Sequence, residues 1–268
     1  MHERLRSVGV TLTMVRKIIL ICTFFFTSCM TKKKEIHIEE RRKIQSFLSQ
    51  FLFAEGAVYS LFGDKPITQM LIFIGSDADR AELSEEQLKK ATFVNDSMTE
   101  NVRAWNRFIH KIQSKRFIFA ERPCRDPHHI IYSLLNIERV KAVLCKYNLD
   151  FTKKIGESFE MNKVIEEFRD PQSYFWKRVL EDHYLSGLLF GYGEENISHF
   201  LNGMDTEIEN QFSDQTDQLV TQNKFPIPIF AVSSQDKTSA HYRKQRLAIQ
   251  KIYQDKDIVD VTVGRLLE

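Results

Sequence analysis

The feature that most constrains this chain is a short apolar run near its N-terminus. The run from Ile18 to Phe26 is nine residues long and is interrupted only by Thr23. About 20 apolar residues are needed to span a bilayer, so the run predicts the core of an export signal rather than a membrane helix. Arg16 and Lys17 stand directly before it, as is typical of signal peptides. We expect the chain to be exported and the remaining residues to fold as a globular body.

The end of this run carries a more specific signal. Phe26-Thr27-Ser28-Cys29 resembles the lipobox of bacterial lipoproteins, in which small residues precede a cysteine that is diacylated before signal peptidase II cleaves. The resemblance implies that residues 1–28 are a signal peptide and that Cys29 becomes an N-terminus carrying palmitate-type chains. Two or three acyl chains anchor a protein stably, whereas one does not. The alternatives are an uncleaved hydrophobic segment and an ordinary buried cysteine.

The residues around the signal extend this prediction. A start at Met14 gives a compact basic signal and makes the first thirteen residues superfluous, so Met14 is a candidate true start. In enterobacteria an aspartate after the lipidated cysteine retains the protein in the inner membrane, so Met30 favours the outer membrane by analogy. The three lysines within residues 29–38 are typical of a solvated, lipidated tether beside the bilayer. We therefore expect a periplasm-facing protein of the bacterial cell envelope.

Composition places the rest of the chain among globular proteins. The 268 residues are 43% hydrophobic and 28% charged, and no break in composition divides residues 39–268. We expect a single globular domain there. The formal net charge is only +2, far from the basic excess that binding to a phosphate backbone requires, so nucleic acid is not an expected partner.

The first half of this domain alternates helical and strand patterns. Apolar residues at three- and four-residue steps predict a helix from Glu39 to about Leu61, ended by Gly63 and Pro66. Capping boxes at Ser84–Gln87 and Ser97–Glu100 predict two further helices. We expect buried strands at residues 67–75, 116–121 and 130–135, and a helix that Asn136 caps and that runs to about Tyr147.

Helical patterns dominate the second half. Apolar residues from Ser173 to Gly191 share one face and predict a single long helix, and a shorter helix ends at Gly203. The polar, glutamine-rich stretch over 205–223 predicts a loop or an exposed helix, and the prolines of 225–230 predict extended chain. A helix over 239–254 and a short alternating segment over 258–263 complete the chain. The predicted fold class is a helix-rich α+β body.

Standard catalytic, phosphate-binding and metal-binding signatures are absent from the sequence. Potential ligands are densest in the segment CRDPHH (124–129). Its adjacent histidines point in different directions on a helix or strand, and the spacing matches no standard metal site. Asp126 before Pro127 is instead typical of a turn. We expect neither a metal ion nor a cofactor.

The four cysteines divide by position. Cys22 lies in the signal and Cys29 is the lipid attachment site, which leaves Cys124 and Cys145. An oxidising compartment can join this pair in a disulfide. The alternative for Cys145 is a buried thiol, because it lies beside the apolar face of its predicted helix.

Segments rich in turn residues resemble a family of exported proteins. The segments YSLFGDKPIT (59–68) and GLLFGYGEEN (187–196), with FPIPIFAV (225–232) as a third, are similar to uncharacterised lipoproteins and exported proteins of chlamydia-like intracellular bacteria. The resemblance covers about thirty residues and implies a bacterial source and an envelope location, but no activity. It singles out polar residues in turns, where binding groups tend to occur, although turn-forming and capping roles explain them as well. These candidate binding residues are Asp64, Lys65, Tyr192, Glu194 and Asn196.

The remaining candidate is His183. It lies on the apolar face of its predicted helix, where a packed histidine is expected more often than a catalytic one. The leading hypothesis is a non-catalytic lipoprotein that binds an envelope protein or a small molecule. The alternative is an exported enzyme, such as a hydrolase, with a cleft near His183 and the Gly191–Asn196 turn. Converging acid, base and donor groups in that cleft would favour the enzyme.

Overall fold

The structure, a computed structural model, divides into two compact units, Met1–Ile38 and Glu39–Glu268. Apart from residues 37 and 38, everything described below belongs to the second unit. None of the helices in the described part of the chain combines the length and the hydrophobicity that a membrane span needs. The structure describes residues 37–74, 96–124, 126–203, 207–208, 226–228, 231–232 and 237–268.

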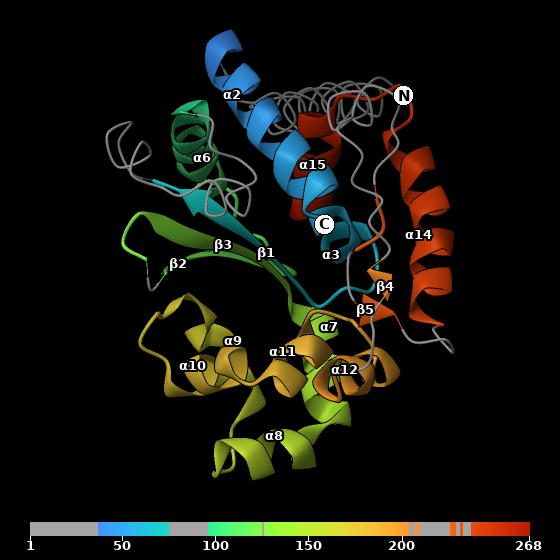
Figure 1. Ribbon diagram of the computed structural model, residues 1–268. Coiled ribbons are helices and arrows are strands. Elements are labelled where there is room, and N and C mark those ends of the chain that lie inside the picture. Colours follow the sequence, from blue (N-terminus) through green and yellow to red (C-terminus); the bar gives the residue numbers. More distant parts are fainter. Residues whose placement is uncertain are drawn as a thin grey trace, which may run out of the picture. The chain divides into compact units, whose positions relative to one another are not determined.

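A three-stranded antiparallel sheet lies at the centre of the second unit (Figure 1). Its strands are β1 (Ile67–Phe73), β2 (Phe117–Pro123) and β3 (His129–Asn136), in the order β1-β3-β2. All three strands were predicted, and the helix-rich α+β class is confirmed. The central strand β3 is buried over most of its length, as its nearly continuous apolar sequence indicates. Helices cover both faces of the sheet.

An aromatic cluster covers one face of the sheet. Phe47 stacks on Trp105 with ring centroids 6.0 Å apart and meets Tyr132 of β3 edge-on at 5.2 Å. Trp105 also contacts Phe119 of β2 edge-on at 5.4 Å. Such pairs add to the stabilisation from apolar burial. The elements on this face are α2 (Ile38–Leu48), η1 (Ser49–Ala54), α3 (Ala57–Phe62) and α6 (Asp96–Ile109).

A second apolar cluster covers the other face. Ile67, Ile118 and Leu135 project from the three strands into it, because directly opposed residues of an antiparallel pair share a face. Asn136 caps the first helix on this face, Ile137–Lys146, as predicted, and its Oδ1 accepts from the backbone N–H of Arg139 at 3.2 Å. The elements here are α7 (Ile137–Lys146), α8 (Asn148–Ile155), α9 (Met161–Glu166), η2 (Glu167–Arg169), α10 (Tyr174–Glu181), α11 (His183–Leu189) and α12 (Glu194–Leu201).

The C-terminal part returns to the first face. The predicted helix over 239–254 is confirmed as α14 (Thr238–Tyr253), and it packs against α3. A short two-stranded ladder pairs β4 (Glu207–Ile208) with β5 (Ala231–Val232). The segment predicted to alternate over 258–263 is instead a helix, α15 (Ile258–Leu267). The expectation is wrong because Asp257 caps the helix, accepting from the backbone N–H groups of residues 259 and 260, and because buried packing overrides β propensity.

Two predicted long helices are broken. The helix expected from Glu39 to Leu61 changes to a π-helical turn in η1 and stops at Gly56, whose φ of 73° is left-handed. The helix expected from Ser173 to Gly191 stops at Asp182, which leaves helical geometry and caps α11 by accepting from the N–H of residue 185 at 2.9 Å. The apolar period runs through both breaks, so periodicity alone missed them. The Ser84–Gln87 helix and most of 205–223 lie outside the described residues.

Candidate functional site

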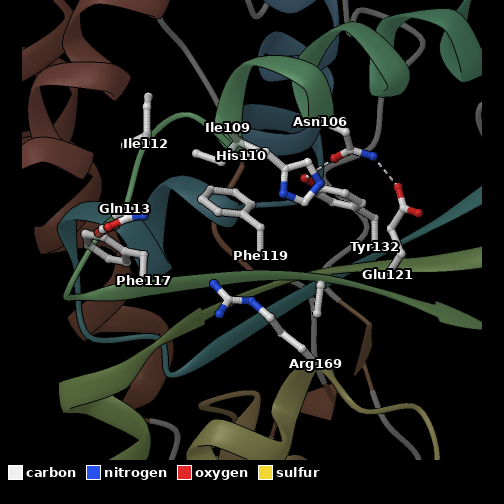
Figure 2. A pocket seen from close by; sticks show the side chains of 12 residues that line it. Asn106, Ile109, His110, Ile112, Gln113, Phe117, Phe119, Glu121, Tyr132 and Arg169 are labelled. Carbon is white, nitrogen blue, oxygen red and sulfur yellow. Dashed lines mark hydrogen bonds between the residues drawn. The ribbon is translucent and has the colours of Figure 1, made fainter.

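A cleft of about 610 Å³ runs along β2. Figure 2 shows Asn106 and His110 approaching it from α6 and the chain that follows, while Arg169 reaches toward it from the opposite side of the strand. Phe117 and Phe119 of β2 supply much of its apolar wall. The cleft therefore combines aromatic surface with a few polar groups, as ligand-binding sites commonly do.

The backbone of β2 contributes to this cleft, because β2 is an edge strand among the described strands. The N–H of Ile137 donates to the carbonyl of Arg116 at 2.9 Å, and the N–H of Cys124 donates to the carbonyl of His129 at 3.3 Å. These two bonds direct the even-numbered residues of β2 toward β3. Since N–H and C=O groups alternate along an antiparallel strand, Phe117, Phe119 and Glu121 direct theirs away from β3; Phe117 is almost fully buried, so the open part of the edge is at Phe119 and Glu121. Within the described residues these backbone groups have no hydrogen-bond partner.

Side chains fix the polar geometry at one end of the cleft. The hydroxyl of Tyr132 donates to Asn106 Oδ1 at 3.0 Å, and Asn106 Nδ2 donates to Glu121 Oε1. Burial raises the pKa of Tyr132 well above its usual value, so the hydroxyl stays a donor. His110 and Arg169 are exposed and make no ion pair with any residue that the structure describes. The cleft thus offers a cationic guanidinium to an incoming ligand.

A second, smaller cavity of about 270 Å³ brings two of the predicted binding residues together. Lys65 comes from the turn before β1, and Tyr192 comes from the turn between α11 and α12. Lys65 is only 6% exposed, which is unusual for a lysine. Glu55 and Gln69, which the sequence analysis did not single out, complete the polar lining, and Phe190, Ile227 and Pro228 are its apolar lining.

Burial dominates the electrostatics of this cavity. It lowers the pKa of Lys65 to about 8, although the nearby charge of Glu55 acts to raise it. It raises the pKa of Glu55 to about 7, against the attraction of Lys65. Burial, with the nearby Glu55 charge, also raises the pKa of Tyr192 to about 12. Near neutral pH the cavity therefore holds a positively charged amine and a carboxyl group that is about half ionised.

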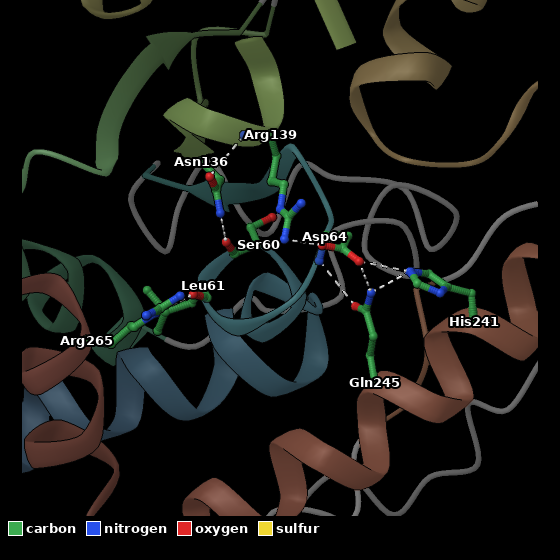
Figure 3. A network of polar contacts seen from close by, with 8 residues as sticks. All are labelled: Ser60, Leu61, Asp64, Asn136, Arg139, His241, Gln245 and Arg265. Atoms are coloured by element: carbon green, nitrogen blue, oxygen red, sulfur yellow. Dashed lines mark hydrogen bonds and ion pairs between the residues drawn. The ribbon is translucent and has the colours of Figure 1, made fainter. Parts of the chain in front are cut away.

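Asp64, the neighbour of Lys65, has a structural role. Its carboxylate pairs with Arg139, lies 3.0 Å from His241 Nε2 and accepts from Gln245 Nε2 at 2.8 Å (Figure 3). The backbone N–H of Asp64 also donates to Gln245 Oε1 at 3.3 Å. The network ties the turn before β1 to α7 and α14. Because the carboxylate is already engaged by three side chains, it is a poor candidate for binding a ligand.

The remaining candidates also have local roles. Glu194 is exposed and accepts from Tyr147 and, at 3.3 Å, from Lys146; the Tyr147 hydrogen bond lowers its pKa. Asn196 is buried and donates to the carbonyl of Tyr192 at 2.9 Å. His183 is not packed as expected: the break at residue 182 places it at the exposed start of α11. Neither of the two cavities described above is lined by His183.

The described residues Asp126–His128 of the CRDPHH segment lie in the turn between β2 and β3. Asp126 accepts from the backbone N–H of His128 at 2.8 Å and lies 3.0 Å from His129 Nδ1, in the turn role that the sequence predicted. Cys124 is partly buried, Cys145 is exposed, and both are free thiols, so Cys145 is not the buried thiol considered above. Across the described ranges, no group of three His, Cys, Asp or Glu side chains is placed to hold a metal ion. Cys29 lies outside the described residues.

Comparisons of the chain with protein-family models, with curated proteins and with solved structures gave no significant match. The two cavities are therefore the candidate binding sites from which a function is inferred. Both contain groups that the sequence analysis missed, namely the edge of β2, Arg169, Glu55 and Gln69. Only Glu55 had a local signal, as an acidic residue that directly follows the apolar run FLFA and precedes Gly56.

Proposed function

We propose that the chain is a lipid-anchored lipoprotein of the bacterial envelope whose globular body binds an extended segment of a partner polypeptide along β2. The observation that carries this proposal is the open edge of β2, where backbone groups without a partner among the described residues line a cleft of about 610 Å³. An edge strand of this kind accepts another strand by backbone hydrogen bonding, and alternate side chains of the added strand then enter side pockets.

The character of the cleft specifies the class of partner. Phe119 offers aromatic surface to apolar side chains, and Arg169 offers a cation that makes no ion pair with any described residue. We therefore expect a segment with apolar residues at alternate positions and a carboxylate, from an acidic side chain or a chain terminus, that reaches Arg169. A second copy of this chain, paired through β2, is the competing occupant. Nucleic acid is not an expected partner at a net charge of +2.

Glu121 provides a sharp test of strand addition. Its N–H points to the open edge, so Glu121→Pro removes a donor and blocks the edge without breaking the β2–β3 ladder. Glu121→Ala keeps the donor and is the matched control. Peptides would be selected from a random phage-displayed library on the full-length chain in detergent, and their affinities measured by fluorescence anisotropy.

We expect the selected peptides to bind the wild type and Glu121→Ala and to lose at least about tenfold in affinity to Glu121→Pro, because two or more backbone hydrogen bonds are lost. Arg169→Ala should weaken acidic peptides and leave neutral ones unchanged. Equal binding to the proline and alanine variants would refute strand addition at β2. If the wild type is dimeric by light scattering and Glu121→Pro is monomeric, the occupant is a second copy.

Anchoring is proposed on separate grounds, the apolar run and the Phe26–Cys29 lipobox. The proposal places the lipidated Cys29 in the outer membrane, with the tether and the body facing the periplasm. We expect metabolic labelling with palmitate to depend on Cys29 and to be lost in Cys29→Ala, which should leave the membrane fraction. Unchanged labelling and fractionation of Cys29→Ala would refute the anchor. That outcome would leave strand addition at β2 to be judged by its own test.

A further inference from the structure

The cavity around Lys65 holds opposite charges that do not pair with each other. No ion pair within 4.0 Å joins Lys65 to Glu55, and neither side chain makes a hydrogen bond to any described residue. Gln69 Nε2 is also buried and has no hydrogen-bond partner in the described part of the chain. Lys65 is buried and Glu55 is partly buried, and charged groups in such places are nearly always paired, so the two charges around one cavity point to a missing partner.

The backbone holds both charges in place. The N–H of Glu55 donates to the carbonyl of Gln50 at 3.2 Å in the π-helical turn, and the left-handed Gly56 then redirects the chain. The N–H of Lys65 donates to the carbonyl of Tyr59 at 3.2 Å, and Pro66 follows directly. Because these bonds fix the backbone, the two side chains are presented to the cavity by the fold itself. π-helical turns of this kind are frequent at functional sites.

We propose that this cavity binds a small zwitterion, an α-amino acid, with its carboxylate on Lys65 Nζ and its ammonium group on Glu55. An anion alone would meet the Glu55 carboxylate, and a cation alone would meet the Lys65 amine. A ligand that carries both charges pairs with Lys65 and Glu55 at once. The inference is independent of strand addition at β2, because the two cavities share no lining residue.

The size and lining of the cavity narrow the ligand further. Its volume of about 270 Å³ lies just below the range of about 300–1,000 Å³ that is typical of drug-sized ligands, so it suits a small metabolite. Phe190, Ile227 and Pro228 give the cavity an apolar lining beside the charged groups of Lys65 and Glu55. We therefore expect amino acids with a small or medium apolar side chain to be preferred over charged ones.

Three probes of similar shape test separately what the carboxylate and the ammonium group of the ligand contribute to binding. Isothermal titration of the full-length chain in detergent would compare L-valine with L-valinamide, which lacks the carboxylate, and with 3-methylbutanoate, which lacks the ammonium group. We expect L-valine to bind and each analogue to bind at least about tenfold more weakly, because each leaves a buried charge unpaired. L-lysine and L-glutamate test the preference for an apolar side chain.

Matched variants assign the contacts. Glu55→Gln keeps the shape of the side chain and removes its charge, and Lys65→Met keeps its length; each should weaken L-valine by at least about tenfold. Lys153→Met, on the exposed face of α8, is the control and should leave the affinity unchanged. Thermal denaturation checks that the variants fold. If no amino acid gives measurable heat with the wild type, or if 3-methylbutanoate binds as tightly as L-valine, the zwitterion site is refuted.

Discussion

Lys65 gives the sharpest test of the energetics inferred for the smaller cavity. Burial lowers its pKa from 10.5 to about 8. Each pH unit of such a change corresponds to about 1.4 kcal/mol, so a charged Lys65 destabilises the fold by about 3 kcal/mol. The side chain is only 6% exposed, so solvent screening reduces this figure little. Below pH 8 the amine is charged in the folded and unfolded chains, and the full penalty applies.

The penalty disappears as the pH rises. Between pH 8 and 10.5 the unfolded chain binds the proton and the folded chain does not, so the free energy of unfolding rises with pH over this window. We therefore expect Lys65→Met to raise the free energy of unfolding by up to about 3 kcal/mol at pH 7 and to have little effect near pH 11. The methionine retains most of the apolar packing of the lysine stem.

The assay is urea denaturation of wild type and Lys65→Met at half-unit steps from pH 7 to 11, with Lys153→Met as the control. Ionisation of Tyr192, whose pKa is raised to about 12, acts at the alkaline end in both proteins. Because the neighbouring acid Glu55 acts on the pKa of Lys65, wild type and Lys65→Met are also compared after Glu55→Gln is introduced into both. If Lys65→Met destabilises the fold by the same amount at pH 7 and pH 11, Lys65 is not the buried, depressed amine described above.

Four further substitutions test the fold that holds these sites. Asn136→Ala removes the cap of α7 and the hydrogen bond that Asn136 Nδ2 donates to the carbonyl of Ser60 at 2.8 Å, so urea denaturation should show a loss of about 2–3 kcal/mol; a loss under 1 kcal/mol would contradict this role. Asp257→Ala removes the cap of α15 and should lower the free energy of unfolding by about 1–2 kcal/mol, whereas no change would mean that packing alone sets this helix. Gly191→Ala places a Cβ 2.3 Å from a tyrosine hydroxyl at a φ of 75° and should lower the melting temperature, while Gly264→Ala, with open space in a helix, should raise stability by up to about 1 kcal/mol. Equal effects of the two glycine substitutions would contradict the left-handed backbone conformation of Gly191.

The secondary structure was largely predictable where one local signal dominated. The three strands follow from short apolar runs, and Asn136 is a cap in both the sequence and the structure. Helix breaks were not predictable in the same way. The apolar period passes through Gly56 and Asp182 without interruption, because both breaks keep the same face buried. Over 258–263 the alternating pattern did not predict a helix, and the Asp257 cap and tertiary packing favour one, α15.

The candidate sites depend on contacts that a sequence does not display. Lys65 and Tyr192 were singled out as polar residues in turns, but 127 positions separate them and only the folded chain brings them to one cavity. The open edge of β2 follows from the strand order β1-β3-β2, which hydrophobic patterns do not specify. Asp64 lies in the same turn as Lys65, but its carboxylate is held by Arg139 and Gln245, so its role is structural.

Both sites are places where the fold leaves its own groups unsatisfied. The edge of β2 keeps backbone donors and acceptors unpaired in the described sheet, and the smaller cavity keeps Lys65, Glu55 and Gln69 without partners among the described residues. In both cases stability alone would favour a different solution, such as a covered edge or apolar side chains. Sequences break local rules mainly where function requires it. Gln69 lies opposite Ser133, on the face of the sheet away from Tyr132, and the two cavities share no lining residue. Binding at one site therefore leaves the surface of the other free, which suits a protein that holds a small ligand and a polypeptide partner at the same time.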